Sequence, residues 1–210
     1  MLCGIAIHFS VAAQWKAGIG QYFYTRVPFS EAFVPVAHIE SPNNFYAELR
    51  YNYEDLKTLS LYIGKTLTGG NNLVYTITPM LGYSTGRFTG ISLGANTDAG
   101  WKKFFLSSQT QYSITIKKSD SLSTKNTADN FFFTWSELAY NFSDHFFGGL
   151  SIQYTRQAGE NNFEPGLLAG LNFKNFSFPF YVFKPLYSER YFVLGVEFQF
   201  NFKQRKKIEL

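Results

Sequence analysis

The end of the chain shows a pattern that recurs through most of the sequence, in which apolar and polar residues alternate. In YFVLGVEFQFNF, residues 191–202, every second position from Phe192 onward is a large apolar residue, whereas the positions between them include Gly195, Glu197 and Gln199. Strict alternation predicts a β-strand with one apolar and one polar face. The apolar face packs either on a soluble core or on lipid, and this choice decides what the protein can do.

Clusters of turn residues divide the chain from residue 43 onward into segments of strand length. The ten predicted strands are residues 43–53, 58–67, 73–84, 88–97, 101–118, 131–142, 145–157, 163–174, 176–184 and 191–202. Each is about long enough for a tilted transmembrane strand of roughly 9–11 residues, and none has the period of a helix. An even number of antiparallel strands lets a barrel close with both ends of the chain on one side. The later connections also alternate between long and tight, as they do in outer-membrane barrels.

The residues before the first predicted strand fall into two parts. The uncharged apolar run MLCGIAIHFSVAA ends in small residues and predicts a secretory signal peptide over 1–13, with a buried first strand as the alternative. It contains Cys3, the only cysteine, so no disulfide can form within the chain. Residues 14–42 are interrupted by three prolines and predict an irregular N-terminal arm, in which GQYFYTRV is one candidate short strand.

Composition favours lipid as the partner of the apolar rows. Aromatic residues make up 20% of the chain and charged residues only 16%, against about a quarter charged in soluble domains. No stretch approaches the roughly 20 continuous apolar residues of a transmembrane helix, so only a closed β-barrel would satisfy the backbone in lipid. Glycine recurs in the polar rows, which suits a crowded concave wall; these glycines are Gly64, Gly82, Gly149, Gly166, Gly170 and Gly195. The predicted fold class is therefore an all-β, antiparallel transmembrane β-barrel of about ten strands over 43–202, with a soluble sandwich or ligand-binding barrel as the alternative.

The formal net charge of +4 is concentrated at the end of the chain. The tail KQRKKIEL, residues 203–210, holds four basic side chains against Glu209. The rest of the chain has no spread basic face, so we expect no nucleic-acid partner. A basic tail next to a barrel suits a position in solvent near anionic lipid headgroups.

The sequence contains no evident catalytic or metal-binding constellation. Its three histidines are His8 in the predicted signal peptide, His38 in the predicted arm, and His145 beside Asp144 in the turn SDH. Asp next to His in a turn usually serves the turn itself, and no two histidines have the spacing of metal ligands. We therefore predict no enzyme activity, no metal and no cofactor, with an outer-membrane lipase or protease as the alternative.

Four charged residues are predicted to meet inside the barrel. If the last strand closes on the first, Glu48, Arg50 and Glu197 lie at similar depth, and Glu137 lies in the same layer across the lumen. A buried charge must be paired, so we expect Arg50 to bridge these carboxylates. The cluster would act either as a structural plug or as a selectivity layer in a narrow pore.

Two resemblances extend these predictions. The segment GVEFQF and the residues after it resemble the C-terminal assembly signal of bacterial outer-membrane barrels, with Gly195, Phe198, Phe200 and Phe202 at the matching positions. This resemblance implies insertion by the outer-membrane barrel assembly machinery, although eight residues follow Phe202. The segments ELRYNYEDLKTLSLYIGKTL and FTWSELAY resemble uncharacterised outer-membrane β-barrel proteins of Gram-negative bacteria, of Bacteroidota-like character. They imply a location in the outer-membrane lipid bilayer and no assigned activity.

Barrel size narrows the functional prediction. Barrels with about this number of strands have interiors largely filled by side chains, and only much larger ones enclose wide channels. The predicted function is therefore a structural or narrow-pore transport role with a filled polar lumen, rather than that of a general porin.

Overall fold

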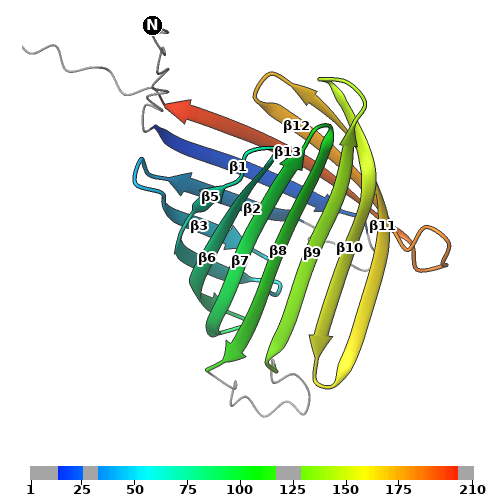
Figure 1. The fold of residues 1–210 in the computed structure, drawn as a ribbon. Helices are drawn as coiled ribbons and strands as arrows, with labels where there is room; N and C mark the ends of the chain where they lie inside the picture. The colour runs from blue at the N-terminus through cyan, green and yellow to red at the C-terminus, as the bar shows by residue number, and fades with distance from the viewer. Residues whose placement is uncertain (1–13, 26–32, 117–128, 203–210) are drawn as a thin grey trace, which may run out of the picture.

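A computed structural model describes residues 14–25, 33–116 and 129–202, with side chains up to residue 200 (Figure 1). The described residues form thirteen β-strands. These are β1 (Trp15–Tyr24), β2 (Phe33–Glu40), β3 (Phe45–Tyr51), β4 (Thr58–Lys65), β5 (Leu67–Gly69), β6 (Leu73–Gly86), β7 (Gly90–Trp101), β8 (Phe104–Thr115), β9 (Phe131–Asn141), β10 (Phe146–Gln157), β11 (Glu160–Phe173), β12 (Phe176–Phe183) and β13 (Tyr191–Phe202). Within these ranges, no helix has the length and apolarity needed to cross a membrane. The predicted signal peptide over 1–13 and the basic tail 203–210 lie outside the described residues and stay predictions.

The strands form one antiparallel sheet that closes on itself. Strands that follow each other in sequence pair side by side, except that β4 and β5 both pair with β6. The sheet closes because β13 pairs with β1. The short β5 continues beyond β4 along the same edge of β6. The result is a closed barrel of twelve strands plus one short extra strand, so the prediction of an antiparallel barrel is confirmed and the prediction of about ten strands is too low.

The two missing strands lie in residues 14–42, which were expected to be an irregular arm. β1 and β2 pair with each other over eight residue pairs, and β1 also pairs with β13 along its whole length. The prediction failed because Pro35 was treated as a break, whereas it lies within β2 opposite Gln21 and pairing continues on both sides of it. A proline removes one ladder hydrogen bond, and the neighbouring pairs in a closed sheet keep the strand in place. The barrel therefore extends over 15–202 rather than 43–202.

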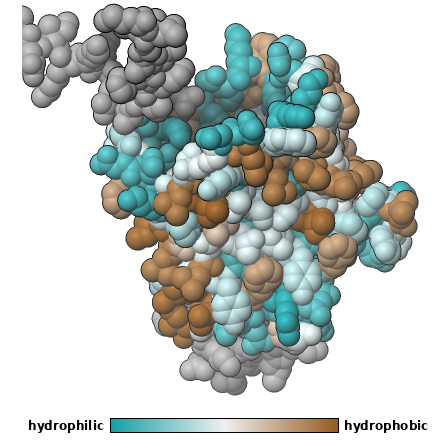
Figure 2. All heavy atoms as spheres, viewed as in Figure 1, coloured by the Kyte–Doolittle hydropathy of each residue, from teal (hydrophilic) through white to brown (hydrophobic). Residues whose placement is uncertain are grey.

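The apolar rows face outward and the polar rows face the interior. On β10, Leu150 is 57% exposed and its neighbour Ser151 is 1% exposed; on β7, Leu93 is 62% exposed and Ser92 is fully buried. Figure 2 shows apolar side chains gathered on the side of the barrel, with hydrophilic residues concentrated toward its upper end. This is the reverse of a soluble protein and is the arrangement of a barrel in lipid. The alternative of a soluble barrel with its apolar rows inside is therefore wrong.

One part of the outer wall carries hydroxyl groups instead of large apolar residues. Ser108 and Thr110 on β8 lie opposite Ser136 and Thr134 on β9. Ser108 and Ser136 are hydrogen-bonded at 2.8 Å, and Thr110 and Thr134 at 2.9 Å. These paired hydroxyls meet their hydrogen-bonding needs without water, as an environment of lipid requires.

The two ends of the barrel differ in their connections. One end, here called the turn end, has connections of two to four residues at 41–44, 70–72, 102–103, 142–145 and 174–175. The start of β1 and the end of β13 lie at this end, because Trp15 pairs with Phe202. The opposite end, here called the loop end, includes the longest connection, 116–130 between β8 and β9. An even strand number and this contrast match the sidedness of membrane barrels.

Glycines in the inward rows make room for aromatic rings from neighbouring strands. A Cβ atom at Gly82 on β6 would overlap the ring of Tyr62 on β4, and one at Gly170 on β11 would overlap the ring of Phe147 on β10. The glycines of the polar rows therefore belong to a crowded concave wall, and the inside of the barrel is packed with side chains.

Candidate functional site

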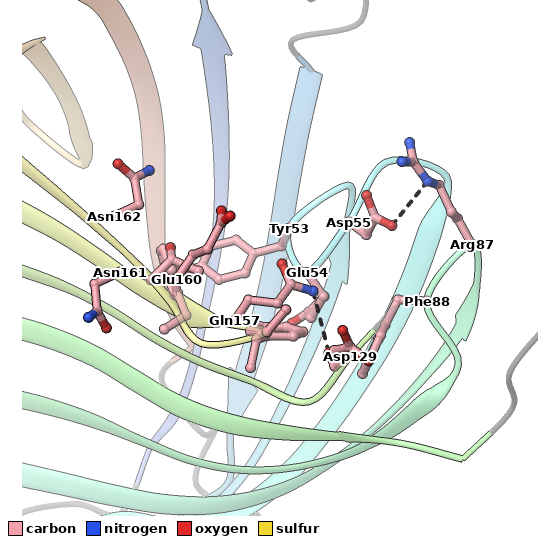
Figure 3. Close-up of a pocket in the computed structure, with 14 residues that line it drawn as sticks. Tyr53, Glu54, Asp55, Arg87, Phe88, Asp129, Gln157, Glu160, Asn161 and Asn162 are labelled. Carbon is pink, nitrogen blue, oxygen red and sulfur yellow. Dashed lines mark hydrogen bonds and ion pairs between the residues drawn. The ribbon is translucent and has the colours of Figure 1, made fainter. Parts of the chain in front are cut away.

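The candidate functional site is the lumen, which contains two cavities lined by described residues. The loop-end cavity has a volume of about 820 Å³ and is lined by the β3–β4 connection, the β6–β7 turn and residues of β9, β10 and β11. Figure 3 shows Tyr53 and Glu54 at this cavity, together with the Asp55–Arg87 ion pair. The turn-end cavity has a volume of about 450 Å³ and is lined by residues of nine strands, including Glu48, Trp135 and Glu197. The two cavities share no lining residue.

A layer of aromatic side chains separates the two cavities. Tyr53, which follows β3, donates a hydrogen bond to Gln109 on β8, and its ring meets that of Phe133 on β9 edge-to-face at 5.7 Å. Tyr22 on β1 contacts Trp135 on β9, with ring centroids 5.5 Å apart. Strands β4, β6, β7 and β8 lie between β3 and β9, so these contacts cross the lumen instead of joining neighbours. We call Tyr22, Tyr53, Gln109, Phe133 and Trp135 the crossbar.

Further aromatic residues fill the lumen beside the crossbar. Together with Trp135 of the crossbar and three aliphatic residues, they form a buried hydrophobic cluster on β9, β11, β12 and β13. The cluster consists of Trp135, Ala139, Leu168, Tyr181, Phe183, Tyr191 and Val193. This cluster was not predicted from the sequence, because its large apolar residues are scattered among polar residues in the inward-facing rows. The glycines of the inward rows could have indicated these aromatic residues. A large inward residue on one strand lies over a glycine on the neighbouring strand, as Phe183 does over Gly166.

The structure places Arg50 inside the barrel in a buried ion-pair network. Arg50 is 2% exposed and Glu48 is 3% exposed. The guanidinium donates to Glu48, lies 3.5 Å from a carboxylate oxygen of Glu54, and donates to Gln111 Oε1 at 2.7 Å. It also stacks on the rings of two tyrosines, 4.4 Å from the centroid of Tyr53 and 4.2 Å from that of Tyr62. Every face of the guanidinium therefore has a partner.

The expected bridge from Arg50 to Glu137 and Glu197 is not formed. Among the described residues Arg50 makes ion pairs with Glu48 and Glu54, and Glu54 was not predicted as a partner. The prediction assumed that the last strand closes on residues 43–53, but β1 and β2 lie between them. Glu197 therefore lies opposite Gly20 on β1.

The other two predicted lumen carboxylates do face the interior. Glu137 and Glu197 line the turn-end cavity together with Glu48. Tyr22 donates a hydrogen bond of 2.7 Å to Glu197. The three predicted carboxylates thus share one cavity, while Arg50 lies inside the barrel but is absent from the lining of this cavity.

The residues of the predicted assembly signal lie on β13. Phe198 packs on Phe176 of β12, with ring centroids 4.4 Å apart, and meets Phe200 at 4.2 Å. Gly195 faces inward, where a Cβ atom would meet Pro179. Phe202 is paired with Trp15 at the end of the strand, and its side chain is outside the described residues. The role of these residues in assembly stays a prediction.

The two histidines within the described ranges contact neighbouring residues of the barrel. His38 stacks on Tyr46 at 5.7 Å, and His145 Nδ1 lies 3.2 Å from the carbonyl oxygen of Asn172. No group of three or more His, Cys, Asp or Glu residues suited to a metal ion occurs in the part of the chain that the structure describes. His8 lies outside these ranges.

Comparison with known proteins identifies the architecture. No protein-family model matches the chain, and no curated protein matches it. Among solved structures, the KdgM porin superposes with a TM-score of 0.54 at 12% identity, covering 88% of this chain and 99% of that one. The same porin in complex with disordered oligogalacturonate gives 0.54 at 13% identity, with the same coverage. The NanC porin gives 0.52 at 9% identity, covering 87% and 98%. The chain has the barrel fold of these porins. At this low sequence identity, the similarity shows a shared fold and nothing about function.

Proposed function

We propose that this protein is a small outer-membrane β-barrel that provides a narrow passage for small solutes. The observation that carries the proposal is a polar lumen with two cavities, one on each side of the crossbar, inside a wall that is apolar on its outside. A purely structural barrel needs no such cavities, because a lumen can be filled completely by side chains.

Several features support the outer membrane as the location. The outward rows are apolar, the backbone is paired around a closed sheet, and the turns are short at the end where β1 starts and β13 ends. A barrel of this kind satisfies its backbone hydrogen bonds in lipid. The likeness to two porins, the predicted signal peptide and the C-terminal aromatic pattern agree with this location. The resemblance to Bacteroidota-like barrels belongs to the same proposal.

The crossbar limits the size of the solute. Tyr53 lies between the cavities, where it donates a hydrogen bond to Gln109 and its ring contacts Phe133. The guanidinium of Arg50 also stacks on this ring. Tyr53 belongs to the β3–β4 connection rather than to a strand, so its position depends on a loop. Loops carry more mobility than strands, so displacement of Tyr53 would widen the connection between the cavities at this point.

The ligand of one similar structure does not suit this lumen. Oligogalacturonate, which is bound in one structure of the KdgM porin, is a chain of acidic sugars. Both cavities of the present barrel are lined by more carboxylates than basic residues. We therefore extend the passage function to this chain but not the acidic ligand.

Conductance in a planar lipid bilayer tests the proposal. The refolded protein is expected to conduct in small steps, and Tyr53→Ala is expected to raise the conductance because it removes the ring that separates the cavities. Tyr51→Ala is the matched control, since Tyr51 lies two residues away on the outer wall and is 38% exposed. A conductance of Tyr53→Ala equal to that of Tyr51→Ala would refute the role of the crossbar.

A structural role is the second candidate, and the dense aromatic cluster of the lumen favours it. Under this alternative the two cavities stay separate even when Tyr53 of the crossbar is replaced by alanine. Absence of conductance in both the wild-type protein and Tyr53→Ala, with the folded barrel verified by its shifted gel migration before boiling, would favour the structural role.

A further inference from the structure

The lumen has a charge pattern that bears on which solutes pass. We infer that the passage admits cations and excludes anions, so that its substrates are small cationic or neutral solutes. This inference rests on the proposed passage function. Three observations support it: the charged groups lining both cavities, the surroundings of the buried arginine, and one buried oxygen without a hydrogen-bond donor in the described structure.

The turn-end cavity has a large excess of negative side chains. Its lining includes a single lysine, Lys16, together with His38. Lys16 lies at the rim, is 57% exposed, and forms an ion pair of 2.9 Å with Glu40. The carboxylates that line the cavity are Glu40, Glu48, Asp98, Glu137 and Glu197.

Three of these carboxylates lack a basic partner. Among the described residues, no lysine or arginine lies within ion-pair distance of Asp98, Glu137 or Glu197. They come from β7, β9 and β13, and therefore from different sides of the barrel. Carboxylates spread around a cavity act on a solute from several directions at once.

The buried Arg50 offsets the charge of Glu48 and Glu54, but it forms no ion pair with Asp98, Glu137 or Glu197. Its guanidinium is already engaged by Glu48 and Glu54 and stacked between two tyrosine rings. It lines neither of the two cavities. A solute in the lumen therefore meets the carboxylates rather than the guanidinium.

The loop-end cavity repeats the same imbalance. The one basic residue among its described lining residues, Arg87, is half exposed and forms an ion pair of 3.2 Å with Asp55. The remaining carboxylates of its lining are Glu54, Asp129 and Glu160. The described lining of each cavity therefore presents more carboxylates than basic side chains to a solute.

A buried oxygen in the turn-end cavity points to a ligand of the same kind. The amide nitrogen of Asn96 lies 3.4 Å from Tyr46 Oη and 3.4 Å from a carboxylate oxygen of Glu48, which fixes the orientation of the amide. Asn96 Oδ1 is buried and has no hydrogen-bond donor within the described structure. An acceptor in this position is satisfied by a solute that donates a hydrogen bond or carries positive charge.

The physical basis is the focusing of electric field in a narrow passage. A cleft lined by charges of one sign, with walls of low dielectric constant, raises the local concentration of the opposite ion by about 10-fold or more. Rings of Asp and Glu side chains make pores selective for cations in this way. Anions meet repulsion of the same origin, and among the described lining residues the basic side chains Lys16 and Arg87 are each already paired with a carboxylate.

Reversal potentials in a planar bilayer under a potassium chloride gradient test the inference. The wild-type protein is expected to favour K⁺ over Cl⁻ by about 10-fold. The double variant Glu137→Gln with Glu197→Gln keeps the shape of both side chains and is expected to lower this ratio several-fold. Glu189→Gln is the matched control, because Glu189 lies in the exposed β12–β13 connection and lines neither cavity. Its ratio is expected to equal that of the wild-type protein.

The outcomes distinguish failure of the cation preference from failure of the passage function. A conducting wild-type protein with equal permeability to both ions, or with preference for Cl⁻, would overturn the cation inference and leave the passage function standing. No conductance in either the wild-type protein or Tyr53→Ala would overturn the passage function and the cation inference together. If the double variant does not fold, Glu160→Gln at the loop-end cavity provides the same comparison.

Discussion

Removal of Arg50 is expected to destabilise the barrel far more than removal of an exposed lysine. Arg50→Met keeps much of the side-chain volume but leaves Glu48 and Glu54 without their cation. The side chains of these two carboxylates are 3% and 0% exposed, so water does not replace the lost partner. Loss of one member of a buried ion pair typically costs about 3–5 kcal/mol in the free energy of unfolding. We expect a loss in this range, with a further contribution from the broken hydrogen bond to Gln111.

Two further variants isolate the cause. Lys16→Met breaks an ion pair at the rim, where the lysine is 57% exposed, and is expected to cost about 0–1 kcal/mol. A triple variant that adds Glu48→Gln and Glu54→Gln to Arg50→Met removes all charge from the network. It is expected to regain most of the stability lost in Arg50→Met, because the penalty comes from uncompensated charge rather than from lost volume.

The assay is urea unfolding of the protein folded in lipid vesicles. Trp135 packs in the buried aromatic cluster, so tryptophan fluorescence reports loss of the folded lumen. Equal midpoints and slopes for Arg50→Met and Lys16→Met would show that Arg50 is not part of a desolvated network. A triple variant no more stable than Arg50→Met would assign the loss to packing instead of charge.

Three other predictions follow from the walls of the barrel. Gly82→Val is expected to cost about 1–3 kcal/mol because it displaces the Tyr62 ring, whereas Gly100→Val has open space and is expected to be near neutral in the same unfolding assay; similar losses for both would contradict the tight fit at Gly82. Leu150→Arg places a charge on the outward face and is expected to lower stability in vesicles by about 2–4 kcal/mol, and an unchanged midpoint would argue against lipid contact there. Phe198→Ser is expected to slow insertion by the assembly machinery in reconstituted vesicles while leaving the folded barrel intact, and unaltered insertion kinetics would refute the assembly role.

The facing of the strands could be predicted from the sequence, because it follows from a local property. Successive side chains of a strand point to opposite faces, so alternation of Leu150 with Ser151 already separates the two environments. Composition then decided which face meets lipid, since few charged residues and many glycines occupy the polar rows. Both predictions hold in the structure.

The number of strands was underestimated because local signals were weighted too heavily. Pro35 and the small residues Gly18 and Gly20 weaken the strand pattern of 14–42. The neighbouring strands on both sides nevertheless hold β1 and β2 in the sheet. Pairing energy from a closed barrel is a tertiary effect, and a single segment read alone does not contain it.

The sequence by itself determined an all-β barrel with an apolar outer wall and a polar lumen, because a period of two residues is encoded within each segment. Only the tertiary structure decided that twelve strands close the barrel, that Arg50 pairs with Glu54, and that Tyr53 reaches across to Phe133. These contacts join residues far apart in the chain. They depend on the number of strands, their register and the point of closure, and each of these is a property of the whole barrel rather than of any one strand.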